Sequence, residues 1–268
     1  MDASKGVRVL KMVKTDHEIA LLRQSALLVS KTLAEVATLI RPGMTTLELD
    51  ARAEEFICDN GGRSGFKGYR GFPKTLCTSV NNQIVHGVPS KTAVLKDGDI
   101  ISVDCGVELN GYYGDSAYTF MVGEVDEPTR KLLQVTRECL FLGIEKAIAR
   151  NRIGDISFAI QQHAESNRYS VVRELLGHGI GTTVHEKPDV PNHGKRGTGV
   201  RLQKNMVLCI EPMINRGKRY VVEERDGWGI RTKDNQPAAH FELTVVVGER
   251  RAESLSTFSF IEEKLKSL

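Results

Sequence analysis

The sequence predicts a mixed α/β protein in which two similar halves share one sheet. Three observations support this prediction. Two capping boxes, Thr15-x-x-Glu18 and Thr45-x-x-Glu48, mark helix starts in the first half. A β-like stretch with regular turn signals follows them, and the order of helix, glycine break, helix and β-rich stretch then repeats. Short similar segments occur at corresponding positions in the two halves, which is the pattern that an internal duplication leaves.

The first helix is expected to begin after Thr15 and continue to Ile40, where Arg41-Pro42-Gly43 stops it. A second helix is expected from Thr45 to near Asn60-Gly61-Gly62. The apolar face of the first helix has helical spacing and comprises Ile19, Leu22, Ala26, Val29, Leu33, Val36 and Ile40.

A glycine-rich stretch, GGRSGFKGYRGFP, follows the second helix. Its interleaved aromatic residues Phe66, Tyr69 and Phe72 favour a binding loop over a flexible spacer. From 74 to 123 the sequence is β-like. Its turn signals lie at Asn81-Asn82, Lys96-Asp97-Gly98 and Asn110-Gly111.

In the second half, a helix with Pro128 near its start is expected to reach about Arg150. Ile153-Gly154-Asp155 should interrupt it, and a further helix should end near Asn167. A β-rich stretch then continues to Gly248. We therefore expect one domain over residues 1–268, with equivalent halves at about 15–123 and 124–248.

The similar segments identify equivalent positions in the two halves. Asp104 lies seven residues after Asp97, and Glu211 lies seven after Lys204. The segments His86-x-x-Pro89 and His185-x-x-Pro188 also correspond. A site is therefore expected where the halves meet.

Composition predicts a soluble cytoplasmic protein. The chain has 268 residues, 40% of them hydrophobic, and its formal charge of +3 does not indicate a nucleic-acid ligand. The beginning of the chain lacks a signal-peptide pattern, and no segment approaches the roughly 20 apolar residues of a membrane span. The five cysteines are scattered along the chain at Cys58, Cys77, Cys105, Cys139 and Cys209. An odd number of cysteines without paired spacing is typical of proteins in a reducing compartment.

The predicted hairpin ISVDCGVELNGYYGDSAYTFMV carries one aspartate on each strand, Asp104 before the turn and Asp115 after it. Its Asn110-Gly111 pair favours a two-residue type I′ turn. Asp104 then faces Ala117. Gly106 faces Asp115, so the two aspartates are diagonal neighbours about 7 to 8 Å apart at the backbone. Like charges this close need a shared proton, an arginine or cations. The hairpin alone leaves two interpretations open: a divalent-metal site, or one aspartate as a solvated turn residue.

The second half adds further candidates. The segment RELLGHGIGTTVHEKP carries His178 and His185, although a single histidine in such a loop is usually structural or exposed. Its glycines resemble a phosphate loop only weakly, because no Lys-Ser/Thr pair follows. Glu211 ends one apolar strand-like run and Glu242 begins another, so each carboxylate needs a partner that offsets its desolvation.

Four carboxylates and one imidazole thus lie on or beside predicted core strands: Asp104, Asp115, His178, Glu211 and Glu242. This donor set suits manganese, iron(II), cobalt or zinc. Two divalent cations balance four negative charges, whereas one leaves an excess. The count therefore favours a dinuclear site, which can hold a bridging hydroxide against a substrate carbonyl.

These motifs make a family recognisable. From about Thr15 to Gly248 the chain resembles the type I methionine aminopeptidases of the pita-bread metallopeptidase superfamily. The resemblance rests on segments in family order, TSVNNQIVHGVP, VDCGVELNGYYGD, LLGHGIGTTVHEKP, IEPMI and FELTVVV. It implies an α/β fold with a curved antiparallel sheet, outer helices and internal pseudo-twofold symmetry. It also implies the five metal ligands named above.

The resemblance further implies a hydrolase that removes the N-terminal methionine of nascent proteins whose second residue is small. A metal-bridging hydroxide would attack the first peptide bond. His185 would contact the scissile carbonyl, His86 would assist the leaving group, and Glu211 would accept a proton. The residues implied around the methionine side chain are Tyr69, Phe72, Cys77 and Trp228. Core packing is the alternative for Trp228, but its Gly-Trp-Gly context favours a position at the rim of the pocket.

Spacing indicates the type, because Glu211 and Glu242 are 31 residues apart and lack the long helical insert of type II enzymes. His240 stands where many relatives have glutamine, Val184 where many have phenylalanine, and Phe72 where tyrosine is common. None of these departures removes a ligand, but each can alter pocket shape or rate.

The resemblance also extends to a second cation and to partners. Asn81 and Gln83 match a segment that holds a monovalent cation in some relatives. A monomer is expected. A transient, salt-sensitive ribosome contact is expected through a basic cluster formed by Lys5, Arg8, Lys11 and Lys14.

Three alternatives remain. An Xaa-Pro peptidase of the same superfamily usually carries an extra N-terminal domain, whereas here about 14 residues precede the first helix. A non-catalytic binding module typically loses metal ligands. A creatinase-like hydrolase works without metals. The complete ligand set disfavours both of the latter.

Overall fold

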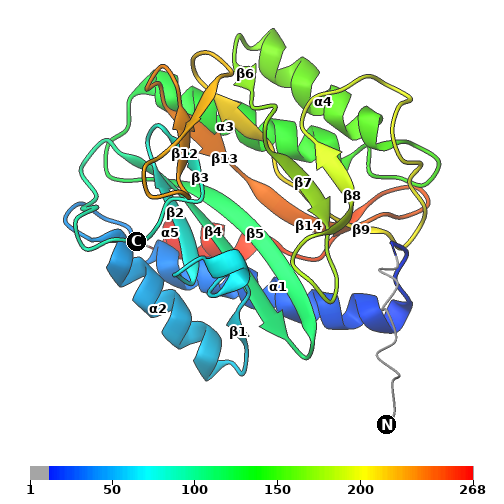
Figure 1. The fold of residues 1–268 in the computed structure, drawn as a ribbon, viewed down its shortest axis with the longest axis horizontal. Helices are drawn as coiled ribbons and strands as arrows, with labels where there is room; N and C mark the ends of the chain where they lie inside the picture. The colour runs from blue at the N-terminus through cyan, green and yellow to red at the C-terminus, as the bar shows by residue number, and fades with distance from the viewer. Residues whose placement is uncertain (1–11, 268) are drawn as a thin grey trace.

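The computed structural model describes residues 12–267. Figure 1 shows helices packed against a large, twisted sheet. The helices are α1 (Asp16–Ala37), α2 (Thr46–Asp59), α3 (Glu127–Ile144), α4 (Ile153–Ser166) and α5 (Ser259–Lys266), with a short 3₁₀ turn at Tyr69–Gly71. The strands are β1 (Arg63–Ser64), β2 (Leu76–Val80), β3 (Gln83–Val85), β4 (Ile100–Leu109), β5 (Tyr112–Met121), β6 (Ser170–Val171), β7 (Leu176–Gly179), β8 (Glu186–Pro191), β9 (Val207–Ile210), β10 (Met213–Asn215), β11 (Val221–Glu223), β12 (Ile230–Thr232), β13 (Ala238–His240), β14 (Glu242–Val246) and β15 (Glu253–Ser254).

The main sheet has the order β1-β4-β5-β14-β9-β7-β8, with β2 also paired to β4 and β15 to β14. Its pairings are antiparallel. Two small sheets, β13-β10-β6 and β11-β12-β3, complete the β structure. The predicted α/β class with an antiparallel sheet and packed helices is confirmed.

The strands β5 and β14 form the seam between the two halves of the sheet. β4 lies outside β5 and β9 lies outside β14, so the order β4-β5-β14-β9 is symmetric about the seam. This order supports the proposal that the two halves are equivalent. One contiguous hydrophobic core spans both, from Leu33 and Val103 to Leu140, Ile160 and Leu208.

Helix α1 begins as predicted. Thr15 caps it, and Thr15 and Glu18 form a complete capping box. The same holds for Thr45 and Glu48 at α2. The prediction that α1 continues to Ile40 was three residues too long. After Ala37 the amides bond three residues back rather than four, so the chain tightens before the proline.

Helix α1 packs on one face of β5, and a glycine makes that approach possible. A Cβ atom on Gly114 would lie 2.4 Å from the backbone nitrogen of Ala26. Successive residues of a strand point to opposite faces. Because Gly114 faces the helix, its neighbour Asp115 faces the other side of the sheet.

The predicted end of α3 and the predicted break after it were wrong. α3 ends at Ile144 rather than near Arg150, because the following residues bond elsewhere. The Ala149 amide donates to the Gly248 carbonyl, and the Arg150 amide donates to the Leu202 carbonyl. Gly154 does not interrupt a helix but lies in the first turn of α4. A Cβ atom there would sit 2.2 Å from the Lys195 carbonyl oxygen, so its absence allows a close backbone approach.

The exposed basic cluster expected near the N-terminus was partly wrong. Lys14 is buried and pairs with Glu186 at 2.5 Å, so its charge is not available to an external surface. The other members, Lys5, Arg8 and Lys11, lie outside the described residues.

All five cysteines are unpaired thiols, and Cys58 alone among them is exposed. Within residues 12–267, no helix combines the length and apolarity needed to cross a bilayer.

Candidate metal centre

The β4–β5 hairpin has the register predicted from its Asn110-Gly111 turn. Asp104 pairs with Ala117, and Gly106 pairs with Asp115. The row of Asp104 and Ala117 continues across the seam, because Glu242 of β14 also pairs with Ala117. Two carboxylates from different halves therefore lie in one row across three strands.

A second row lies one step further along the strands. His178 of β7 pairs with Cys209 of β9, and Cys209 pairs with Thr244 of β14. The Thr244 hydroxyl donates to the Asp115 carbonyl at 2.7 Å, which links this row to β5. Side chains two residues apart share a face, so Asp104, Asp115 and Glu242 project to the side of the sheet opposite the face on which Gly114 approaches α1.

The hydroxyl groups reinforce the seam where the rows cross it. Ser116 donates to the Glu242 carbonyl at 2.7 Å. Thr119 donates to the His240 carbonyl at 2.7 Å and accepts from the His240 amide at 3.0 Å. These bonds fix the backbone beside the ligand candidates, and the position of the carboxylates is set by the sheet rather than by a loop.

The His178 imidazole is held in a defined orientation. Its Nδ1 lies 2.9 Å from the Gly179 carbonyl oxygen, to which it must donate. Burial lowers the pKa of His178 to about 4, so the ring is neutral at pH 7. Nε2 then carries a free lone pair, 3.5 Å from Glu211 Oε1 and 3.9 Å from Asp115 Oδ2. This is the arrangement that a metal-binding histidine adopts.

Burial and close spacing disfavour the charged forms of the four carboxylates. Burial raises the pKa of Asp104 to about 7, against a hydrogen bond with Asp115 that lowers it. Burial, followed by neighbouring carboxylates, also raises the pKa values of Asp115, Glu211 and Glu242 well above their ordinary range. The mutual repulsion of these groups indicates that the site is built for positive charge.

The donor set fits divalent cations. Asp104 Oδ1, Asp115 Oδ1 and Glu242 Oε1 are buried without a hydrogen-bond partner, which is rare for carboxylate oxygens unless an ion satisfies them. Among the described residues that line the cavity, Arg70 is the only arginine or lysine. Its side chain is exposed, so it does not neutralise the buried carboxylates. Four carboxylates and a neutral imidazole match the ligands that manganese, iron, cobalt and zinc accept.

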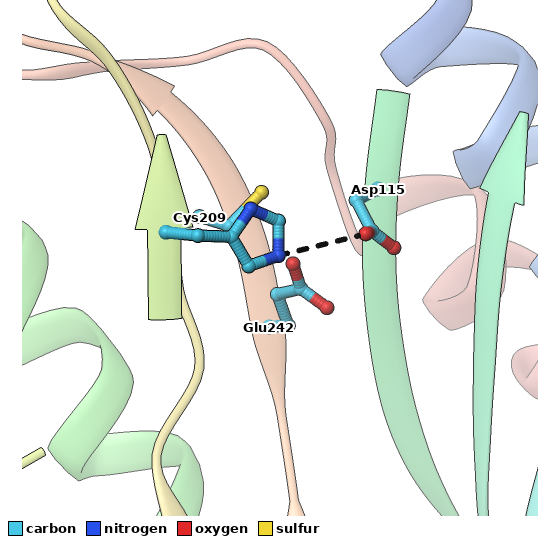
Figure 2. A group of neighbouring side chains, drawn as sticks. Asp115, Cys209 and Glu242 are labelled. Carbon is cyan, nitrogen blue, oxygen red and sulfur yellow. Dashed lines mark ion pairs between the residues drawn. The ribbon is translucent and has the colours of Figure 1, made fainter. Parts of the chain in front are cut away.

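One cluster of donor atoms includes Cys209, a residue that the sequence analysis missed as a candidate ligand. Donor atoms of Asp115, His178, Cys209 and Glu242 lie within 4.8 Å of one another. Figure 2 labels Asp115, Cys209 and Glu242, whose side chains point toward one another. Burial and nearby carboxylates raise the pKa of the Cys209 thiol well above its usual range. It therefore stays protonated, and Cys209 packs in a buried cluster with Leu22 and Ala26 of α1. Its place two residues before Glu211 on an apolar run was the signal that could have found it.

A cavity of about 290 Å³ opens onto these rows. Every residue predicted for the site lines it: Asp104, Asp115, His178, Glu211, Glu242, His86, His185, Tyr69, Phe72, Cys77 and Trp228. The interpretation of one aspartate as a solvated turn residue is therefore wrong. Phe66, which was expected in a binding loop, also lines it, and so do residues that sequence reasoning missed, namely Arg70, Val85, Glu174, Leu175, Leu176 and Met213. Most of these come from loops or short strands without a local pattern.

One wall of the cavity is an apolar cluster of Phe66, Phe72, Cys77 and Val184, with Trp228 packed against it. Phe72 and Trp228 meet edge to face at 5.1 Å. Trp228 is only partly buried, which places it at the rim rather than in the core. Val184 packs in this cluster and is not among the residues that line the cavity.

Histidines occupy the polar side of the cavity. The His185 ring lies 4.2 Å from the His178 ring, and its Nδ1 lies 2.9 Å from the Tyr69 hydroxyl. His86 is exposed at the cavity and has a positive φ of 59°. His240 is buried, with neither ring nitrogen hydrogen-bonded, and its Nε2 lies 3.7 Å from Glu211 Oε2.

The expected monovalent-cation segment has its side-chain oxygens in use. Asn81 Oδ1 accepts from the Ile100 amide at 3.0 Å. Gln83 Oε1 accepts from the Val80 amide at 3.1 Å. Each oxygen retains one further lone pair, and the monovalent site stays a prediction.

The fold and site together define a metallopeptidase. Residues 20–249 match the model of metallopeptidase family M24. The protein is 47% identical over 245 residues to the methionine aminopeptidase of Clostridium acetobutylicum, covering 91% of this chain and 98% of that relative. It is 47% identical over 236 residues to methionine aminopeptidase 1 of Bacillus subtilis, covering 88% and 95% of the two chains.

Solved structures agree. The methionine aminopeptidase of Thermotoga maritima superposes with a TM-score of 0.90 and 42% identity, covering 91% of this chain and 98% of that chain. The X-Pro aminopeptidase of the same organism gives a TM-score of 0.71 at 22% identity, and this chain covers 62% of it. The latter likeness shows the shared pita-bread fold alone. The chain belongs to the methionine aminopeptidases of metallopeptidase family M24.

Proposed function

We propose that this protein hydrolyses the first peptide bond of polypeptides and releases their N-terminal methionine, with a preference for a small second residue. The observation that supports this most directly is the convergence of all predicted site residues on one cavity. Buried carboxylates with unpartnered oxygens line one side of it, and an apolar aromatic wall lines the other. The carboxylates that would hold the metal ions therefore lie beside the apolar wall that would contact the methionine side chain.

We propose that two divalent cations bind here, held by Asp104, Asp115, His178, Glu211 and Glu242. Four carboxylates require about two divalent charges for neutrality, and the rows bring ligands from both halves to one place. Bound cations would supply an activated water at neutral pH and polarise the substrate carbonyl. The donor set admits manganese, iron, cobalt or zinc without selecting one.

The remaining polar residues would act on the peptide bond. Tyr69 fixes the His185 ring through Nδ1, which directs Nε2 toward the scissile carbonyl, where it would stabilise developing negative charge. His86, on the cavity rim, would contact the peptide nitrogen and assist its departure. Glu211, whose pKa is raised by burial, would accept the proton from the attacking water.

The apolar wall would take the methionine side chain. Phe72 and Trp228 present ring edges and faces, and sulfur makes favourable contacts with aromatic rings. Cys77 adds a second polarizable atom, and its thiol stays protonated because burial raises its pKa. The apolar lining of this wall suits an uncharged side chain and disfavours a charged one.

An Xaa-Pro peptidase is the second candidate, because prolidases share the fold. Those likenesses lie at 19–22% identity and extend over only 62–66% of the longer chains. Similarity to methionine aminopeptidases is roughly twice as high and extends over nearly their whole length, so we favour removal of methionine.

The experiment that tests the proposal strips the protein with a chelator and measures amino-acid release from Met-Ala-Ser and Ala-Pro-Ser. Mn(II), Co(II), Fe(II) or Zn(II) is then added back in separate titrations. We expect metal-dependent release of methionine only, abolished in Asp104→Ala and retained in the exposed control Asp59→Ala. Cleavage of Ala-Pro-Ser instead would identify an Xaa-Pro peptidase. Cleavage of neither, with metal demonstrably bound, would exclude both enzymes.

We further propose a cytoplasmic monomer that contacts the ribosome transiently. Five unpaired thiols support a reducing compartment. Lys14 cannot contribute to a ribosome contact, because it is buried against Glu186. Co-sedimentation with ribosomes at low and high salt tests this proposal, and binding that survives high salt would contradict a weak electrostatic contact.

A further inference from the structure

A buried ion pair connects the start of the described chain to the turn that carries His185. Lys14 Nζ lies 2.5 Å from Glu186 Oε2, and the two side chains are 6% and 2% exposed. They are 172 positions apart in the sequence. Removing two charges from water is costly, so such a pair is a poor source of stability by itself. Its geometric effect on the residues around it is therefore more informative.

The Lys14 backbone is fixed to the ligand-bearing part of the sheet. Its amide donates to the Asn205 carbonyl at 2.9 Å, and the Asn205 amide donates to Val247 at 2.9 Å. Val13 forms a β-bridge with Met206. The ammonium group therefore projects from an anchored segment beside β9 and β14.

Glu186 uses its other oxygen to close the neighbouring turn. Glu186 Oε1 accepts from the Thr182 amide at 2.9 Å and, more weakly, from the Thr183 amide at 3.3 Å. The Thr183 hydroxyl in turn donates to the His185 carbonyl at 3.2 Å. One carboxylate thus holds two backbone amides of the turn and the ammonium group at the same time.

The turn presents His185 to the cavity. Gly181 lies beneath the ammonium group, where an added Cβ atom would sit 2.5 Å from Lys14 Nζ. Its carbonyl accepts from the Tyr113 amide at 2.9 Å. The backbone of the turn is thereby held at Gly181 and at Glu186, and His185 directly precedes the second of these points.

We propose that Lys14 and Glu186 are positioning residues, which act through the 181–185 turn to hold His185 against the cavity. The inference rests on the proposed function for the catalytic role of His185. Neither residue lines the cavity, so any effect on turnover has to pass through the turn.

Lys14→Met removes the charge and keeps the length of the side chain. We expect kcat on Met-Ala-Ser to fall about 10- to 100-fold, since a misplacement of about 1 Å can cost that much. KM should stay within about twofold, because the lost interaction concerns the transition state. Metal content after reconstitution should equal that of the parent protein. Lys14→Arg, which retains the charge, should recover most of the lost kcat.

The matched control is Lys187→Met, which breaks the exposed Lys187–Asp189 pair on the same strand and should leave kcat unchanged. In a His185→Ala background, Lys14→Met should have little further effect, because both changes remove one function. Equal fold losses of kcat in the two backgrounds, or a loss of bound metal in Lys14→Met, would overturn the proposal. So would an unchanged kcat.

A second measurement does not need activity. In protein labelled with ¹⁵N-histidine, the ring signals of His185 are assigned by their loss in His185→Ala. We expect them to shift or broaden in Lys14→Met and not in Lys187→Met. If the parent protein proves inactive on Met-Ala-Ser, the proposed function fails and this spectrum still decides the positioning role. If Lys14→Met does not fold, Glu186→Gln, which keeps an acceptor for the two amides, carries the same tests.

Discussion

Asp104 and Glu242 lie on opposite sides of Ala117, each paired with it in register. Neighbouring strands are about 4.8 Å apart, so the two acidic residues start about 10 Å apart at the backbone. Their carboxylates reach toward each other over a single methyl group. The fully buried Ala117 therefore leaves the space between the carboxylates free.

A larger residue at position 117 should fill that space. We expect Ala117→Leu to reduce metal affinity at least about tenfold and to lower the free energy of unfolding by about 1–3 kcal/mol through overpacking. Isothermal titration of the metal-free protein and chemical denaturation measure the two effects. Ala53→Leu, an overpacking change in the helical core, should lower stability without weakening metal binding. Equal metal affinity in both variants would contradict the role assigned to Ala117.

The stability of the metal-free protein should depend on pH through Asp104. Its pKa is raised by burial from an ordinary 3.8 to about 7, so the folded state holds a proton that the unfolded chain has released. This contribution is complete below about pH 4 and is lost as the pH rises through about 7. We expect the metal-free Tm to fall between pH 5.5 and 8 and the Tm gain on adding metal to increase over the same range. Calorimetry with and without chelator measures both trends. Asp104→Asn should make them less steep without removing them, because burial also raises the pKa values of Asp115, Glu211 and Glu242.

His178 and Cys209 should respond differently to substitution, although both have donor atoms in the same cluster. His178 offers a neutral ring with a free lone pair, whereas the Cys209 thiol remains protonated. We expect His178→Ala to lower metal affinity more than about tenfold and Cys209→Ala to leave metal content unchanged. Metal analysis after reconstitution distinguishes the two. A comparable loss in Cys209→Ala would show that the thiol is a ligand.

Trp228 should report occupation of the apolar wall, because it is the only tryptophan in the chain. Free methionine binding beside it should change its fluorescence. Norleucine, which lacks the sulfur but keeps the shape, should act similarly, and glycine should have no effect. Phe72→Ala removes the edge-to-face contact and should weaken methionine binding about two- to tenfold, since such pairs contribute about 0.5–1.5 kcal/mol. A methionine titration without any fluorescence change would place the side chain elsewhere.

Much of the fold and site followed from local sequence signals. The Asn110-Gly111 turn determined the register of its hairpin, and with it the facing of Asp104 and Asp115. Both capping boxes form as expected. The chemistry of the candidate ligands was predictable, because charged residues beside apolar strands need a partner that offsets their desolvation.

The remainder depended on contacts between distant segments. Lys14 was predicted to be an exposed basic residue, because no local sequence pattern indicates its partner Glu186, which lies 172 residues away. Gly154 looked like a helix breaker, because the carbonyl that approaches it belongs to Lys195. Leu175 and Leu176 reach the cavity from a segment without periodicity, so their positions follow from the folded chain and not from a local pattern.

The two cross-strand rows have a consequence for evolutionary change in this protein. The backbone separation of Asp104, Asp115 and Glu242 is set by the register of the sheet and not by the conformation of a loop. Helices, loops and the aromatic wall can drift while the reactive centre keeps its dimensions. Relatives that share fewer than half of their residues with this chain can therefore retain a common chemistry, and selectivity for substrates can diversify at the rim.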